Sequence, residues 1–163
     1  MIDHRAQSRR VRIAVWFGTI LPLPFIVGAF VLGWRLARLP DDAEIYAKFR
    51  LLSGMLFALG FALGLRGAIL ALVYPSRSQR IAEIAVVVFG CGNIVAAFNI
   101  TRFISAGNWP FGDSVLGPLI VPVVLWIFSI LLMVNSARLK RSEAVKVKAG
   151  ESKEEQPLHL SLP

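Results

Sequence analysis

The sequence has 163 residues, of which 56% are hydrophobic and 17% are charged, and its formal net charge at pH 7 is +8. Soluble domains carry about a quarter charged residues, so this composition is typical of an integral membrane protein. The chain has one cysteine, Cys91, and its two histidines, His4 and His159, stand near the ends of the sequence. A single thiol excludes an intramolecular disulfide, and we expect neither a metal site nor a cofactor.

Four apolar segments dominate the sequence, at about 13–34, 51–74, 82–104 and 115–136. At 1.5 Å rise per residue, each is long enough to cross roughly 30 Å of hydrocarbon. The sequence therefore predicts an all-α membrane protein, an antiparallel bundle of four transmembrane helices. Arginines precede the first segment, as in a signal peptide. Because that segment is too long for one and lacks a small-residue cleavage pattern, we predict an uncleaved span.

The flanking segments predict the domain organisation and the orientation. We expect a basic cytoplasmic N-terminus at 1–12, a membrane domain at 13–141 and a disordered basic tail at 142–163. Twelve of the 18 Lys and Arg residues lie on the side of the termini, five lie on the other side, and Arg66 lies within a span. This bias predicts that both termini lie in the cytoplasm. The expected partners are the lipid bilayer and other membrane subunits or further copies of the chain, not nucleic acid.

Prolines mark the first span and the limits of the second helix. Pro22 and Pro24 lie near the middle of the first span. Each removes a backbone donor and crowds the preceding turn, so we expect a kink there. In the following loop a proline precedes acidic residues, which favours a helix start near Asp41 or Asp42. Pro75 is expected to end that helix.

Small residues recur along the second span. Gly60, Gly64 and Ala68 stand four residues apart and share one helical face. A small-xxx-small pattern of this kind lets two helix backbones approach closely, so these residues predict a helix-packing seam. At 100° per residue, Arg66 lies on a different face of the same helix.

Arg66 is the one charged residue between Arg50 and Arg77, inside the second span. Glu83 stands early in the next span, after a short turn, so the two helices are expected to be adjacent and antiparallel. We predict a structural ion pair between Arg66 and Glu83. The alternative is a polar ligand pocket formed by Arg66, Glu83 and Asn93, since ionisable groups within spans are often functional.

The remaining motifs point to a protein without catalysis. Trp34 and Trp109 stand near span ends and are expected to anchor the protein at the membrane interface. No hydrolase, phosphate-binding, zinc-protease or cysteine-pair motif occurs, so we expect no enzyme activity and no catalytic residues. The favoured function is an accessory or structural subunit of a larger membrane complex. The alternative is a transporter or enzyme bundle that binds a small molecule or a lipid.

Three segments carry a family resemblance: FRLLSGMLFALG at 49–60, GCGNIVAAFNI at 90–100, and the GNWPFGD loop before a proline-containing last span. Together they resemble small four-helix bacterial inner-membrane proteins of a domain-of-unknown-function family that is loosely related to the DoxX-like group. The resemblance covers roughly residues 14–137. It implies a four-helix membrane fold, a location in a bacterial inner membrane and no established reaction.

Overall fold

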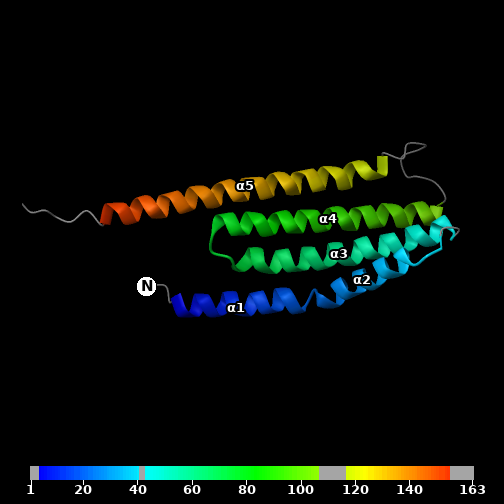
Figure 1. Ribbon diagram of the computed structural model, residues 1–163, viewed down its shortest axis with the longest axis horizontal. Coiled ribbons are helices and arrows are strands. Elements are labelled where there is room, and N and C mark those ends of the chain that lie inside the picture. The colour runs from blue at the N-terminus through cyan, green and yellow to red at the C-terminus, as the bar shows by residue number, and fades with distance from the viewer. Residues whose placement is uncertain (1–3, 41–42, 107–116, 155–163) are drawn as a thin grey trace, which may run out of the picture.

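The computed structural model describes residues 4–40, 43–106 and 117–154, and most of these residues are helical (Figure 1). The helices are α1 (His4–Ile20), α2 (Leu23–Ala37), α3 (Ile45–Val73), α4 (Arg77–Ala106) and α5 (Gly117–Glu154). Four segments are long and apolar enough to cross a membrane: Val11–Ala37, Ile45–Val73, Arg77–Ser105 and Ile120–Val145. The predicted multi-pass helical membrane fold is confirmed.

The first span is broken into α1 and α2 at Leu21–Pro22. Pro22 and Pro24 have no backbone N–H, so the carbonyls of Gly18 and Ile20 lack their usual helical donors. The chain resumes helical bonding at once, because the N–H groups of Phe25 and Ile26 both donate to the Pro22 carbonyl, at 3.0 and 3.1 Å. The kink predicted at these prolines is confirmed.

Two helix limits differ from the sequence-based expectation. α3 begins at Ile45, after Glu44, rather than near Asp41 or Asp42, which lie outside the described residues. Its end at Val73 agrees with a stop at Pro75. α5 continues to Glu154, so residues 142–154 are helical and not a disordered tail. Within this part of α5, the Glu143 carboxylate accepts hydrogen bonds from Ser76, before α4, and from Ser78, in its first turn.

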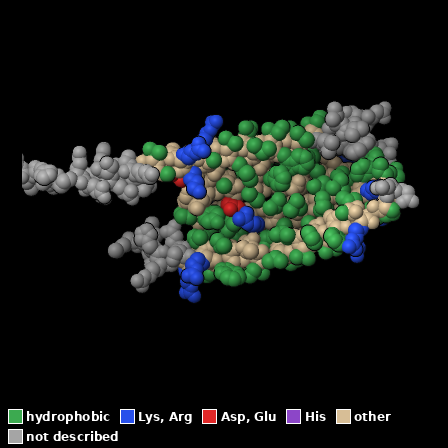
Figure 2. Space-filling view, viewed as in Figure 1, with side chains coloured by type: hydrophobic (Ala, Val, Ile, Leu, Met, Phe, Trp, Pro, Cys, Tyr) green, Lys and Arg blue, Asp and Glu red, His purple; other side chains and the backbone are tan. Residues whose placement is uncertain are grey.

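The spans lie side by side in one layer (Figure 1). α5 packs on α4, α4 packs on α3, and α3 packs on both α1 and α2. Among the described residues, α5 makes no substantial contact with α1 or α2, so the first and last spans do not close the bundle into a ring. The layer therefore has two open faces. Hydrophobic side chains predominate between the two ends of the face shown in Figure 2, where a basic and an acidic side chain also lie together.

The interface between α3 and α4 repeats every seven residues. Ser53, Gly60 and Gly67 of α3 meet Ala97, Gly90 and Glu83 of α4 in antiparallel order. A Cβ added to Gly60 would stand 2.6 Å from the Gly90 carbonyl oxygen, and one added to Gly67 would stand 2.7 Å from the Glu83 carbonyl oxygen. Backbones this close have no room for a side chain.

The predicted seam of Gly60, Gly64 and Ala68 is therefore only partly right. A Cβ on Gly90 would stand 2.8 Å from the Gly64 backbone nitrogen, so Gly64 belongs to the interface. Ala68, however, is exposed, and Gly67 takes its place. The reason is geometric: steps of four residues rotate 40° around the helix each time, whereas steps of seven stay close to one line.

α5 also contacts α4 along a seven-residue repeat. Pro122 and Ser129 are fully buried, Ser136 is 7% exposed, and Glu143 follows at the same spacing. The Ser129 hydroxyl donates to the Ala85 carbonyl at 2.7 Å, and the Ser136 hydroxyl donates to the Ser78 carbonyl at 2.7 Å. Small and hydroxyl-bearing residues thus hold α5 in place, while most of its large apolar side chains remain exposed.

Candidate functional site

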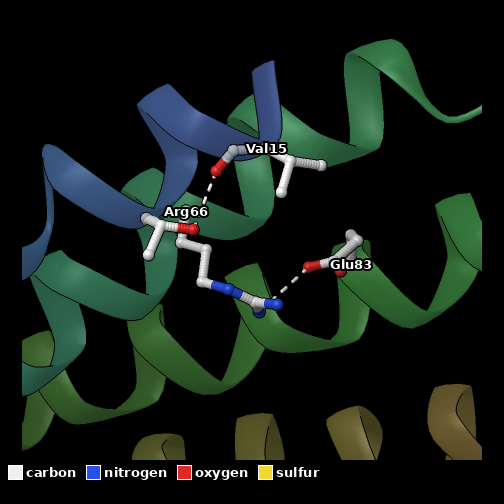
Figure 3. Close-up of polar contacts among 4 residues, drawn as sticks. Val15, Arg66 and Glu83 are labelled. Atoms are coloured by element: carbon white, nitrogen blue, oxygen red, sulfur yellow. Dashed lines mark hydrogen bonds and ion pairs between the residues drawn. The ribbon is translucent and has the colours of Figure 1, made fainter. Parts of the chain in front are cut away.

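Arg66 of α3 and Glu83 of α4 form an ion pair within the spanning part of the protein (Figure 3). The Arg66 Nη1 and Glu83 Oε2 atoms are 3.4 Å apart. Arg66 stands seven residues before the end of α3 and Glu83 six residues after the start of α4, so both lie about 10 Å from the connecting turn. The pairing predicted from the sequence is present.

The neighbouring glycine explains why the carboxylate is buried. Gly67 follows Arg66 and lets the Glu83 backbone come within contact distance of α3. The Glu83 side chain is consequently 12% exposed, whereas the Arg66 side chain is 41% exposed. The guanidinium has five donors in a planar fork, and this single contact leaves most of them available to another acceptor.

Asn93 lies apart from this pair. It stands ten residues after Glu83 on α4, about 15 Å along the helix axis. Its side chain is buried beside Gly60, and a Cβ on that glycine would stand 3.0 Å from the Asn93 Cβ. The Asn93 Nδ2 atom is buried without a hydrogen-bond partner. The structure thus brings Arg66 and Glu83 together and does not join Asn93 to them in one pocket.

Of the two tryptophans predicted to anchor the protein at the membrane interface, the structure describes Trp34. Trp34 is 51% exposed near the end of α2, and the Arg38 guanidinium carbon lies 4.1 Å from the centroid of its ring. This cation–π contact places a basic and an aromatic group together where the span ends, as expected of an interface anchor. Trp109 lies outside the described residues.

Hydroxyl groups that were not predicted from the sequence also join the spans. Ser53 of α3 donates to the Ala97 carbonyl of α4 at 2.8 Å, as Ser129 and Ser136 of α5 do to other α4 carbonyls. The seven-residue spacing of Ser129 and Ser136 was a usable signal, because hydroxyls within apolar spans commonly bond to neighbouring helices. Among the described residues, no three His, Cys, Asp or Glu side chains gather where they could hold a metal ion.

No protein-family model matches this chain, and no curated protein or solved structure is significantly similar to it. The resemblance to relatives of the DoxX-like group stays a prediction. A functional conclusion therefore depends on the geometry of the ion pair and of the helix layer.

Proposed function

We propose that this chain is a non-catalytic subunit, accessory or structural, of a larger complex in a bacterial inner membrane. The observation that supports this most directly is the 41% exposure of the Arg66 side chain within a spanning segment. A charged side chain in hydrocarbon costs about 2.5–3.5 kcal/mol on insertion scales. A second polypeptide over Arg66 would exclude lipid and supply acceptors for the remaining guanidinium donors.

The open layer supports the same proposal. α3 packs on α4 and on both α1 and α2, and the Arg66 side chain reaches from α3 toward Glu83 of α4 (Figure 3). Because the spans do not close into a ring, this face of α3 is not covered by α5. The ion pair with Glu83 also holds the guanidinium at its depth, since the carboxylate is itself buried between α3 and α4.

The alternative of a ligand pocket at Arg66, Glu83 and Asn93 has less support. Asn93 is about three helical turns from Glu83 and is enclosed beside Gly60. A ligand that used all three side chains would have to separate α3 from α4 at their closest backbone contact.

Site-specific photo-crosslinking in native membranes tests the proposal. A photoreactive amino acid at Leu59 lies seven residues from Arg66, on the same face of α3. The matched control is Phe57, nine residues from Arg66 and half a turn away. We expect a discrete protein adduct from position 59 and none from position 57. An adduct of twice the chain's mass would identify the partner as a second copy. Absence of a protein adduct at 59, or equal adducts at both positions, would contradict the proposal.

The proposed orientation has both termini in the cytoplasm. A phosphatase reporter that is active only outside the cytoplasm should be silent when fused after Arg141 and active when fused after Leu39, in the loop between α2 and α3. The reverse pattern would overturn the orientation and leave the subunit proposal intact.

A further inference from the structure

A groove of about 410 Å³ runs between α3 and α4, near the start of α3 and the end of α4. Its walls are formed by Arg50, Gly54 and Phe57 of α3 and by Ile94, Phe98 and Thr101 of α4. Phe57 stands nine residues from Arg66, so this groove opens on the opposite face of α3 from the ion pair. It does not depend on the proposed function.

The length and direction of the groove match one membrane leaflet. Phe57 lies near the middle of α3, whereas Arg50 lies near the end of the apolar part. The step of seven residues from Arg50 to Phe57 rises about 10 Å along the helix axis. The groove therefore runs from the level of the lipid headgroups toward the bilayer centre, parallel to the direction of an acyl chain.

The floor of the groove is suited to an apolar occupant. The Ser53 hydroxyl donates to the Ala97 carbonyl at 2.8 Å and lies 2.7 Å from the Thr101 hydroxyl, which lies 2.9 Å from the same carbonyl. The protein itself thus satisfies both hydroxyls, so they do not call for a polar ligand. The Phe57 and Phe98 rings flank the opening and are 50% and 65% exposed.

Charge is confined to the headgroup end. Arg50 is the charged residue of the lining, and it is exposed. An arginine guanidinium at this level forms charge-assisted, often bidentate hydrogen bonds with phosphate oxygens. We propose that the groove binds an acyl chain of an anionic phospholipid, with the lipid phosphate at Arg50.

The test uses the full chain in nanodiscs that contain phosphatidylglycerol with a diazirine on its acyl chain. After irradiation, peptide mapping should find the label concentrated at residues 54–57 and 94–98. Unlabelled phosphatidylglycerol should compete with this labelling, and phosphatidylcholine should compete weakly. Arg50→Gln should reduce labelling about fivefold, the effect of one basic side chain at a membrane surface.

Arg102→Gln is the matched control. Arg102 is exposed near the end of α4, close to the groove, and carries the same charge as Arg50. It does not line the groove. We expect labelling within twofold of the unchanged protein. Both changes are at exposed positions, and thermal unfolding in detergent checks that each variant is folded. Label spread evenly over the exposed faces of α2 and α5, equal competition by both lipids, or equal effects of the two arginine changes would each overturn the proposal.

Discussion

Alanine substitutions at Gly60 and Gly64 give a matched test of the α3–α4 interface. A Cβ on Gly60 would stand 2.6 Å from the Gly90 carbonyl oxygen and 2.9 Å from the Ile94 Cγ1 atom, whereas a Cβ on Gly64 would meet nothing within 4 Å. Both changes gain about 1 kcal/mol of intrinsic helix propensity. Gly60→Ala additionally forces the two backbones apart, and overpacking of this kind typically costs about 1–3 kcal/mol.

Because the propensity gain cancels between the two variants, Gly60→Ala should be less stable than Gly64→Ala by about 1–3 kcal/mol. Each 1.4 kcal/mol is about a tenfold change in the unfolding equilibrium. The measurement is an SDS titration of the purified protein in mild detergent, followed by tryptophan fluorescence. Gly90→Ala should behave like Gly60→Ala, because a Cβ added to Gly90 would stand 2.6 Å from the Gly60 carbonyl oxygen. A stability loss at Gly64 equal to that at Gly60 would refute the reasoning.

Three further predictions concern other contacts. Arg66→Leu and Glu83→Gln should each destabilise the protein more than the two changes combined, because the double variant leaves no unmatched charge; a coupling energy near zero in the same titration would refute a stabilising pair. Ser129→Ala should cost about 0.5–1.5 kcal/mol for its lost bond to the Ala85 carbonyl, while Thr19→Ala, an exposed hydroxyl that bonds within its own helix, should cost less. Glu143→Ala should speed trypsin cleavage after Arg77, at the start of α4, because Ser76 and Ser78 on either side of it lose their hydrogen bonds to the carboxylate; an unchanged cleavage rate would contradict this role.

Features set by one stretch of sequence were predictable here. Span length follows from hydrophobic thickness, and the break at Pro22 follows from a missing donor. The contact between Arg66 and Glu83 was predictable too, because a short turn places residues equally far from it at the same depth on adjacent antiparallel helices. Each of these depends on local chemistry and chain length.

Features that depend on the register between helices were not predictable. Gly67 rather than Ala68 continues the interface, because Gly67 is the residue that meets the Glu83 backbone of α4. The alternative pocket placed Asn93 with Arg66 because both are polar residues within spans. In the structure Asn93 is buried farther along α4, away from Arg66. The contact of Glu143 with Ser76 and Ser78, beyond Arg141 on α5, likewise joins residues that are distant in the sequence.

The single-layer arrangement gives this protein two lateral edges in the plane of the membrane, much as a β-sheet has two edge strands. α3 and α4 are interior members, and their tight backbone contact allows little change of side-chain volume. The outer side of α5 is an edge, where residues such as Leu131 and Ile127 are more than half exposed. Apolar substitutions at such an edge change the surface that the layer offers to adjacent molecules in the membrane, without changing how the layer folds. The adjacent molecules can therefore differ while the α3–α4 pair stays constant.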